Sequence, residues 1–293
     1  MTPETGVELS RYTTIGTGGP ARAFARPTTL AELEAALRFA AARDLPARVV
    51  GLGSNLLAAD EGVEALVLRL EGGLAEARCD ADLLVAGGGA TNAVCLHRAR
   101  AAGLGGFEFA CAIPGTAGGG VWMNAGAYGS DWASILVRAL VATATGVGWL
   151  APAELGLSYR HSDLGAGQVV AAVEYRLEPR PAAEIRRTIT ELVALRKASQ
   201  PTTTRTFGSV FKNPPGDAGA GRLIESCGLK GFRRGGATIS TKHANFIENT
   251  GGAITADCLA LMREARRRVH ELYGIDLEHE VVLLGESALQ ALD

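Results

Sequence analysis

Glycine-rich loops are the parts of this sequence best suited to holding a ligand. Three of them follow strand-like segments: GTGGPA from Gly16, GLGSN from Gly51 and IPGTAGGG from Ile113. Glycine lets successive backbone N–H groups point into one concavity, which suits a pyrophosphate. The second loop adds a hydroxyl and a carboxamide, from Ser54 and Asn55. Any one of these loops alone is also typical of a tight turn between strands.

A neutral segment surrounds the third loop. The stretch AIPGTAGGGVWMNAGAY, residues 112–128, contains five glycines and no charged side chain. Small uncharged residues let the backbone approach a flat ring system closely. Together with the other loops, this segment favours a large, mostly apolar cofactor with a diphosphate tail, and FAD fits that description. A Walker phosphate loop is absent, and Pro20 stands where the helix of a Rossmann site should already be running.

The composition is typical of a globular cytoplasmic protein. The 293 residues are 47% apolar with a net charge of −2, so we expect a sizeable core and no global attraction to nucleic acid or to an anionic membrane. The five cysteines form no C-x-x-C pair, and the five histidines lack metal-ligand spacing. We therefore expect reduced thiols and no metal site. The N-terminus, MTPETGVELS, lacks the basic start and apolar core of a signal peptide.

Apolar patterns predict a mixture of strands and helices. A capping box of Thr29 and Glu32 begins one helix, and further helices are expected over residues 182–199 and about 257–273. Two strands are expected around a glycine turn at 146–148. Because the elements do not alternate strictly as βαβα, an α+β fold is favoured over a doubly wound parallel sheet. The polar stretch QPTTTRTFGS predicts a crossover into a second domain near residue 200.

The last helix and the last strand carry specific expectations. The helix should end at Gly274, with Leu272 on its inward face. In the terminal strand, DLEHEVVLLG, Glu280 shares side-chain parity with Val282 and Leu284, so its carboxylate should lean towards an apolar face. Such a group is costly to bury unless it is paired or functional.

Seven motifs occur in a single order along the chain. They are GLGSNLL, IPGTAGGGVWMNAGAYG, YRHSDL, GSVFKNP, GRLIESCGLKG, KHANF and LEHEVVLLG. Together they resemble the UDP-N-acetylenolpyruvoylglucosamine reductase (MurB) family, in a shorter, type II-like form without an extra substrate-covering loop. The similarity runs from about Leu9 to Gly285. Each motif alone is weak, but their joint occurrence is highly specific.

This resemblance implies a two-domain flavoenzyme. It implies an FAD-binding domain of the PCMH or vanillyl-alcohol-oxidase type over residues 1–200, in two lobes of about 1–70 and 71–200, and a smaller α+β substrate-binding domain over 201–293. The implied reaction is the NADPH-dependent reduction of the enolpyruvyl group of UDP-N-acetylglucosamine enolpyruvate, which gives UDP-N-acetylmuramate for peptidoglycan. The choice of NADPH over NADH rests on the resemblance alone. The residues expected to hold FAD are Gly51, Gly53, Ser54, Asn55, Leu56, Ile113, Pro114, Gly115, Thr116, Gly118, Gly119, Asn124, Gly126 and Ala127.

The implied reaction needs a proton donor and a cation for the substrate carboxylate, because charge builds up on that carboxylate as hydride arrives. The resemblance assigns the proton to Ser209 and the carboxylate to Arg160, whose planar fork suits it. It makes Glu280 the third catalytic residue, which orients and stabilises Arg160 or the enolate. From the residues alone, a strand serine, a surface arginine and a strand-edge glutamate are the ordinary interpretations.

The nucleotide diphosphate also needs receptors. Lys212 and Asn213, next to Ser209 in GSVFKNP, are the better candidates, and Arg233 and Lys242 lie in a basic stretch without acidic residues. A solvated loop is an equally good interpretation of Arg233. No role is assigned to His161 or His243.

Two alternatives remain open at this stage. One is an FAD oxidase or dehydrogenase of the same fold that acts on another alcohol or sugar, which would not need an acid paired with a carboxylate clamp. The other is a nucleotide-sugar binder without catalytic activity, which would purify as a colourless protein.

Overall fold

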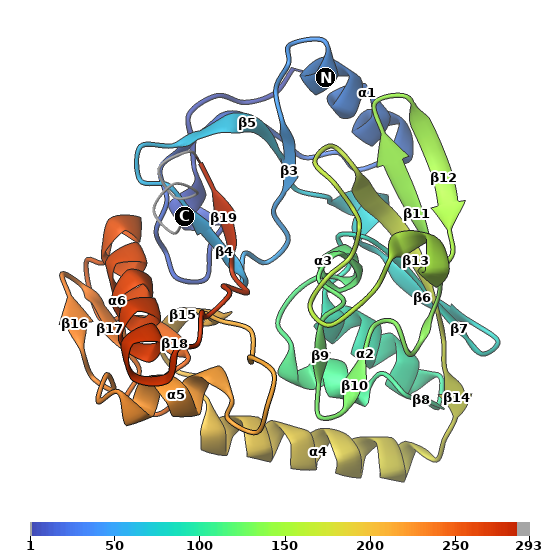
Figure 1. Cartoon of the computed structure of the whole chain (residues 1–293). Coiled ribbons are helices and arrows are strands. Elements are labelled where there is room, and N and C mark those ends of the chain that lie inside the picture. Colours follow the sequence, from blue (N-terminus) through green and yellow to red (C-terminus); the bar gives the residue numbers. More distant parts are fainter. Residues whose placement is uncertain (1, 286–293) are drawn as a thin grey trace. The chain divides into compact units, whose positions relative to one another are not determined.

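A computed structural model describes residues 2–285 and divides the chain into two compact units (Figure 1). Unit 1 consists of Met1–Thr5, Ala23–Leu52 and Ala65–Arg196. Unit 2 consists of Gly6–Arg22, Gly53–Glu64 and Lys197–Asp293. Two short N-terminal segments therefore belong with the C-terminal part of the chain. The two predicted domains, 1–200 and 201–293, remain a prediction, and their outermost residues, 1 and 286–293, lie outside the described residues.

Unit 1 is built on a five-stranded antiparallel sheet. Its strand order is β12-β11-β13-β7-β6, with β6 Ala77–Asp80, β7 Leu83–Gly87, β11 Leu136–Thr143, β12 Gly146–Leu150 and β13 Val169–Arg176. Side chains of β13 contact two apolar clusters, and an irregularity in its pairing with β11, which leaves Ala171 as an extra residue, changes which positions face each side of the sheet. Val169 and Ala171 pack in the cluster that contains Leu33, whereas Val173 and Tyr175 pack in a cluster with buried aromatic rings.

Helices cover this sheet. α1 Leu30–Ala41 supplies Leu33 and Leu37 to the first cluster, and Thr29 caps the helix by accepting a hydrogen bond from the Glu32 N–H at 3.3 Å. The other helical elements of this part of the chain are η2 Gly72–Ala75, α2 Asn92–Ala101, η3 Glu108–Ala112, α3 Ala117–Trp122, η4 Pro152–Leu155 and α4 Ala182–Ser199. Short strands complete it: β3 Ala47–Val49, the pair β8 Leu104–Gly105 with β14 Glu178–Pro179, and the pair β9 Gly126–Ala127 with β10 Ser130–Asp131.

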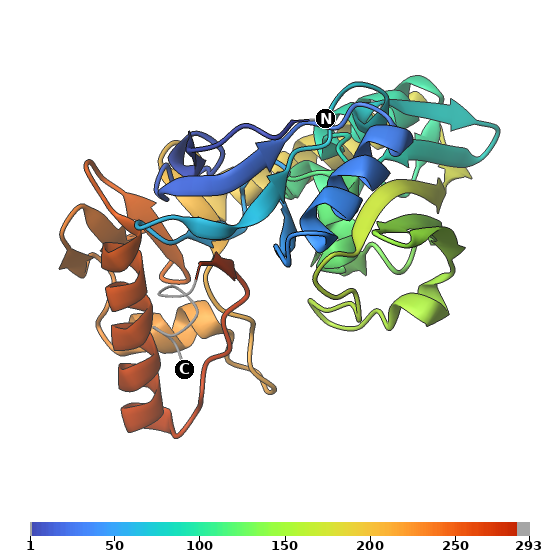
Figure 2. The ribbon, with the colours of Figure 1, turned by 90° about the horizontal axis from the view of Figure 1, so that it is seen from above.

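Unit 2 contains a four-stranded antiparallel sheet covered by helices. Its order is β15-β18-β17-β16, with β15 Arg205–Ser209, β16 Arg233–Arg234, β17 Ala237–Ile239 and β18 Phe246–Asn249. α6 Thr255–Tyr273 runs beside β16 and β17, and α5 Ala220–Ser226 packs against α6 (Figure 2). The buried cluster of this unit includes Phe207, Met262 and Val269.

A second, parallel pairing joins distant segments of unit 2. β4 Leu56–Ala58 pairs with β19 Val282–Leu284. The N-terminal segment adds β1 Val7–Glu8 and η1 Leu9–Arg11, while β2 Pro20–Ala25 and β5 Val63–Leu68 each continue from one unit into the other. The residues that follow the GLGSN loop are thus hydrogen-bonded to the C-terminal strand.

The α+β prediction is confirmed, but three local predictions are wrong. Residues 146–148 belong to β12, because the hairpin turns at residues 144–145. Leu272 is 59% exposed and does not face inward. Glu280 precedes β19 and is not part of it. The neutral segment contains α3, which the sequence concealed because three of the six residues of this helix are glycines, poor helix formers.

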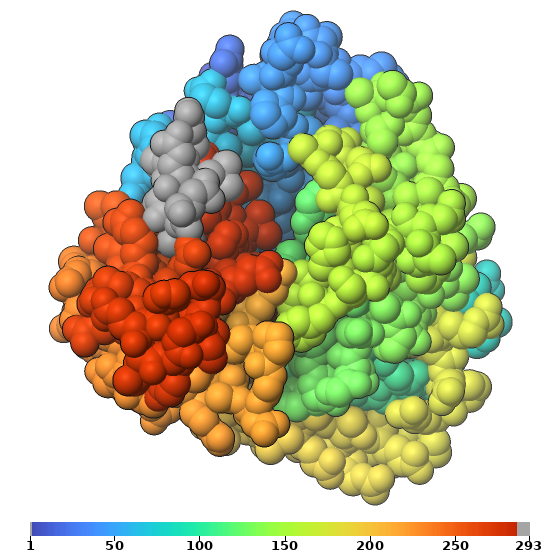
Figure 3. All heavy atoms as spheres, viewed as in Figure 1, coloured from blue at the N-terminus to red at the C-terminus, as the bar shows by residue number. Residues whose placement is uncertain are grey.

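The long helices reach the surface. The colours of α4 and α6 are both prominent on the face drawn in Figure 3. Only Ile185 is buried among the 18 residues of α4, and Leu195 is 54% exposed. None of the helices among residues 2–285 combines the length and the apolar composition needed to cross a membrane.

Candidate active site

Unit 2 brings the backbones of Ser209 and Glu280 together. The Glu280 N–H donates to the carbonyl of Val210, the residue after Ser209, at 2.8 Å. An antiparallel bridge between Phe211 and His279 continues this pairing. Ser209 and Glu280 are both half-buried, so each side chain retains access to solvent or to a ligand. Two of the three predicted catalytic residues therefore lie on adjacent, hydrogen-bonded stretches of backbone.

The second glycine loop lies beside the same segments. Asn55 Nδ2 donates to the Glu280 carbonyl at 3.1 Å, and the Val282 N–H donates to the Asn55 carbonyl at 3.0 Å. Gly208 has a φ of +83°, and a Cβ at this position would stand 3.1 Å from the Ser54 carbonyl oxygen. The predicted FAD loop, Ser209 and Glu280 thus belong to one hydrogen-bonded arrangement within unit 2.

Close packing explains why this loop needs glycine. Gly53 has a φ of +66°, and a Cβ there would stand 1.9 Å from the Tyr12 carbonyl oxygen. The Gly53 carbonyl accepts hydrogen bonds from the N–H and the hydroxyl of Thr14 at 3.0 and 3.2 Å. The Thr14 hydroxyl also donates to the Thr206 carbonyl at 2.6 Å. Thr14 therefore links the glycine loop to β15, which ends at Ser209, and this role gave no signal in the sequence.

In unit 1, the neutral segment folds into a capped short helix. The Thr116 hydroxyl accepts a hydrogen bond from the Gly119 N–H at 3.3 Å. Gly118 and Gly120 are packing positions, because a Cβ at Gly118 would stand 2.9 Å from the Gly88 carbonyl and one at Gly120 would stand 2.3 Å from the Trp132 ring. These two glycines let α3 lie close against its neighbours.

Gly119 differs from the glycines on either side of it. It is exposed, and the Thr116 hydroxyl oxygen, at 3.3 Å, is the nearest atom that a Cβ there would meet. Any side chain at this position would therefore project outward over an uncharged backbone. This bare surface fits the close approach of a flat, neutral ring, so the residues present suit the FAD that the sequence predicts.

Arg160 lies against the same segment. Its Nη2 donates to the Gly126 carbonyl at 2.6 Å, and its guanidinium carbon lies 5.1 Å from the centre of the Tyr159 ring. Arg160 has a φ of +54°, a left-handed conformation that is uncommon for a residue with a side chain. Such strain persists only where neighbouring contacts hold it, and it is concentrated at functional sites.

Two further hydrogen bonds dock the loop that carries Arg160. Asn124 Nδ2 donates to the Ser158 carbonyl at 2.8 Å, and the Ser162 hydroxyl donates to the Trp122 carbonyl at 2.6 Å. Asn124 Oδ1 in turn accepts a hydrogen bond from the Ala133 N–H at 2.9 Å. Asn124 is 2% exposed, and its amide is engaged with the backbone. Its assignment to FAD binding remains a prediction.

A cavity of about 510 Å³ opens beside the start of the neutral segment in unit 1. It is lined by Ile113, Pro114 and Gly115, three of the predicted FAD residues, and by side chains of α2 and α4. Arg100 and Arg196 contribute positive charge, and none of the lining residues is acidic. Gly51 lies next to this segment, since a Cβ there would stand 2.8 Å from the Thr116 hydroxyl oxygen.

The four predicted substrate-binding residues already have partners within unit 2. Lys212 forms an ion pair with Glu278, and Asn213 Oδ1 accepts a hydrogen bond from the Ala220 N–H at the start of α5. Lys242 Nζ donates to the Lys197 carbonyl. Arg233 donates to the hydroxyls of Thr238, across its hairpin, and of Thr250, which follows β18, both at 3.0 Å. Their roles towards a substrate remain predictions.

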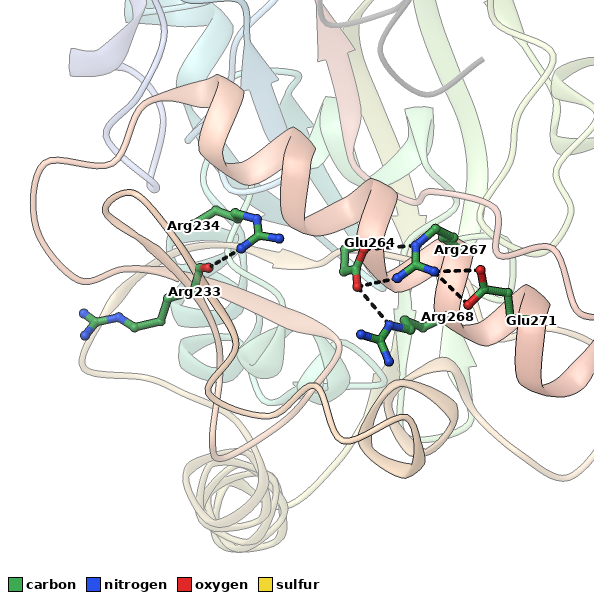
Figure 4. Close-up of polar contacts among 6 residues, drawn as sticks. All are labelled: Arg233, Arg234, Glu264, Arg267, Arg268 and Glu271. Carbon is green, nitrogen blue, oxygen red and sulfur yellow. Dashed lines mark hydrogen bonds and ion pairs between the residues drawn. The ribbon is translucent and has the colours of Figure 1, made fainter.

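The arginines near the end of α6 are engaged with acidic side chains. Glu264 accepts hydrogen bonds from Arg267 and Arg268, and Arg267 also bonds Glu271 (Figure 4). The hydrogen bond from Arg267, followed by the one from Arg268, lowers the pKa of Glu264 to about 2.

Among the described residues, no group of three or more His, Cys, Asp and Glu side chains is placed to hold a metal ion.

Two models of protein families match the chain. The model described as FAD binding domain matches residues 21–148. The model described as UDP-N-acetylenolpyruvoylglucosamine reductase, C-terminal domain, matches residues 200–284. The first match covers the Gly51 loop and the neutral segment, and the second covers Ser209 and Glu280.

Relatives over nearly the full length agree with these matches. A UDP-N-acetylenolpyruvoylglucosamine reductase from Anaeromyxobacter sp. is 45% identical over 285 residues, which are 97% of this chain and 89% of that protein. UDP-N-acetylenolpyruvoylglucosamine reductase 2 from Symbiobacterium thermophilum is 44% identical over 281 residues, 95% of this chain and 91% of that protein.

A solved structure gives the same result at the level of the fold. The crystal structure of UDP-N-acetylenolpyruvylglucosamine reductase (MurB) from Thermus caldophilus has a TM-score of 0.85 and 40% sequence identity, and the match covers 97% of this chain and 100% of that one. The chain therefore belongs to the UDP-N-acetylenolpyruvoylglucosamine reductase (MurB) family of flavoenzymes.

Proposed function

We propose that this chain reduces the enolpyruvyl group of UDP-N-acetylglucosamine enolpyruvate to give UDP-N-acetylmuramate, a precursor of peptidoglycan, and that it does so in the cytoplasm. FAD is its cofactor and NADPH its source of electrons. Besides family membership, one structural observation supports the proposal. The backbone around Ser209, the backbone around Glu280 and the Asn55 loop are hydrogen-bonded to one another within unit 2.

When bound at the glycine loops, FAD would supply hydride to the methylene carbon of the enolpyruvyl group, with NADPH as the source of electrons. The neighbouring carbon must then receive a proton. Ser209 is the proton donor, because its hydroxyl has no hydrogen-bond partner among the described residues and is half-buried. Since an alkoxide is a poor product at neutral pH, nearby charge or a relay of water must assist this serine.

Arg160 receives the substrate carboxylate. As hydride arrives, negative charge develops on this carboxylate, and a guanidinium held in place stabilises that charge without reorganising. The planar fork of an arginine can bind both oxygens of a carboxylate, and the hydrogen bond to the Gly126 carbonyl helps to hold this side chain in place.

Glu280 supports the other two groups. Its main chain is bonded on one side to Val210 and on the other to Asn55, so its position is set by the same backbone that carries Ser209. Its carboxylate orients the groups that act on the substrate. The two loops around Gly53 and Gly119 hold FAD, and Lys212, Asn213, Arg233 and Lys242 bind the nucleotide sugar.

Stopped-flow absorbance tests this proposal. The purified protein should be yellow, lose its flavin absorbance on mixing with NADPH, and regain it on mixing the reduced enzyme with UDP-N-acetylglucosamine enolpyruvate. A colourless protein that binds the nucleotide sugar would favour the binding protein. Reduction of the flavin by an alcohol or a free sugar, with no reoxidation by the enolpyruvyl compound, would favour the oxidase.

A further inference from the structure

Asn245 bonds the two residues that follow Ser209. Its Oδ1 accepts a hydrogen bond from the Phe211 N–H at 3.0 Å, and its Nδ2 donates to the Phe211 carbonyl at 2.8 Å. Its main-chain carbonyl accepts from the Val210 N–H at 2.9 Å. Asn245 is 4% exposed, and Val210 and Phe211 are 1% and 2% exposed. Water therefore cannot replace these hydrogen bonds without a change in packing.

Hydrogen bonds fix the backbone of the two residues after Ser209. The Val210 carbonyl accepts from the Glu280 N–H, so all four polar groups of the Val210 and Phe211 main chain are paired, three of them with Asn245. The next N–H, from Lys212, donates to the Glu278 carbonyl at 2.9 Å. The same short segment thus connects Ser209 with Glu280 and with Lys212.

The backbone before Ser209 is irregular. The pairing of β15 with β18 shifts register between Thr206 and Ser209, and Gly208 has a φ of +83°. An irregularity of this kind in a strand changes the direction in which a side chain points and is common next to active sites. Because the Ser209 hydroxyl can move only by rotation about χ1, its place is set by the backbone on both sides.

We propose that Asn245 is a positioning residue for Ser209 in proton transfer. By clamping Val210 and Phe211, it holds the serine hydroxyl where the substrate carbon needs a proton, and it keeps the Glu280 backbone in register with the serine. The inference rests on the proposed role of Ser209. The sequence pointed to the KHANF motif but gave no reason to choose its asparagine.

Only an amide suits this clamp. The Phe211 main chain presents an N–H and a carbonyl to the same side chain, so the partner must offer one acceptor and one donor. In Asn245→Asp, a carboxylate oxygen would face the Phe211 carbonyl and repel it, while the size of the side chain stays the same. The segment would then shift, and a displacement of about 1 Å can slow a positioned reaction about 100-fold.

The test is a double-mutant cycle between Asn245→Asp and Ser209→Ala, followed in each half-reaction. Asn245→Asp should slow reoxidation of the reduced flavin by the enolpyruvyl nucleotide sugar about tenfold or more and leave reduction by NADPH within about twofold. In the Ser209→Ala background, the same change should slow reoxidation less than about twofold, because no serine remains to be positioned.

Asn249→Asp is the matched control. Asn249 lies on the neighbouring part of β18, and its amide also bonds main-chain groups, those of Ile15, Gly251 and Ala253. It should lower stability without a selective effect on reoxidation. If Asn245→Asp does not give a folded flavoprotein, Asn245→Ser, which keeps a hydroxyl and admits a water molecule, completes the same cycle.

The outcomes separate the two claims. If Ser209→Ala slows reoxidation but Asn245→Asp slows it equally in both backgrounds, the positioning role is wrong and the proposed function stands. If Ser209→Ala leaves reoxidation at the wild-type rate, the proposed role of Ser209 is wrong, and the inference falls with it.

Discussion

The surroundings of Arg160 in unit 1 and of Ser209 in unit 2 are held by different kinds of contact. Around Arg160, side chains of Asn124, Ser162 and Arg160 itself bond main-chain carbonyls. Around Ser209 and Glu280, most hydrogen bonds join main chain to main chain. Replacing a residue usually leaves its main-chain N–H and carbonyl groups in place, so main-chain hydrogen bonds persist. A hydrogen bond made by a side chain is lost when that side chain is replaced. Single substitutions should therefore disturb the surroundings of Arg160 easily and those of Ser209 only at a few positions.

The largest effect in this comparison is expected at Arg160 itself. Arg160→Lys keeps the charge but loses the planar fork, so reoxidation by the substrate should slow about 100-fold while reduction by NADPH changes little. Stopped-flow absorbance measures both steps. A rise in KM with an unchanged rate of reoxidation at saturation would reduce Arg160 to a binding residue.

A substitution in the Gly53 loop should lower both the stability of unit 2 and the retention of FAD. Gly53→Ala places a methyl group against the Tyr12 carbonyl at a left-handed position, which should lower the free energy of unfolding by about 1–3 kcal/mol and reduce FAD retention. Denaturant unfolding and the ratio of flavin to protein absorbance measure the two effects. Gly148→Ala is the control, since no atom lies within 4 Å of its Cβ position. Equal behaviour of the two variants would contradict the packing argument.

Asn124 tests the side-chain contacts of unit 1. Asn124→Ala leaves the Ser158 carbonyl and the Ala133 N–H without their partner, so we expect a loss of about 1–3 kcal/mol and a slowing of reoxidation of about tenfold. The exposed Ser134→Ala should change neither property. Normal reoxidation with reduced FAD retention would instead support the prediction that Asn124 contacts the cofactor.

The smallest effect is expected from pH. His243 Nδ1 accepts a hydrogen bond from the Asn245 N–H at 3.2 Å, which requires that nitrogen to be unprotonated. Burial, and then the charge of Lys230, lower the pKa of His243, while Glu225 acts in the opposite direction. The folded protein therefore binds fewer protons than the unfolded chain.

Stability from His243 should be complete above about pH 6.5, where a free histidine titrates, and should be lost as the pH falls below this value towards the lowered pKa. The free energy of unfolding, measured between pH 7.5 and 5.5, should fall less steeply in His243→Gln than in the wild type. A slope unchanged in His243→Gln would show that other groups cause the decline.

The sequence predicted much of this molecule because its motifs are local. The helices over 30–41, 182–199 and 255–273 follow from apolar periodicity and capping residues. FAD and the family were predicted from the glycine loops and the order of seven motifs, and both predictions are confirmed.

The features that could not be predicted from the sequence depend on contacts between segments that are distant along the chain. The joining of residues 6–22 and 53–64 to the C-terminal part of the chain has no local signature. The contacts of Thr14 and Asn245 and the left-handed conformation of Arg160, a residue that the sequence did predict, were missed for the same reason, since they depend on backbone groups far away in the sequence. The roles of the predicted site residues remain predictions, because they depend on bound ligands.

The rate at which reduced Ser209→Ala is reoxidised by UDP-N-acetylglucosamine enolpyruvate tests the central claim most directly. We predict normal reduction by NADPH, normal FAD content and reoxidation slowed by about 10²- to 10⁴-fold, the usual contribution of a general acid. Reoxidation at the wild-type rate in this variant would contradict the account.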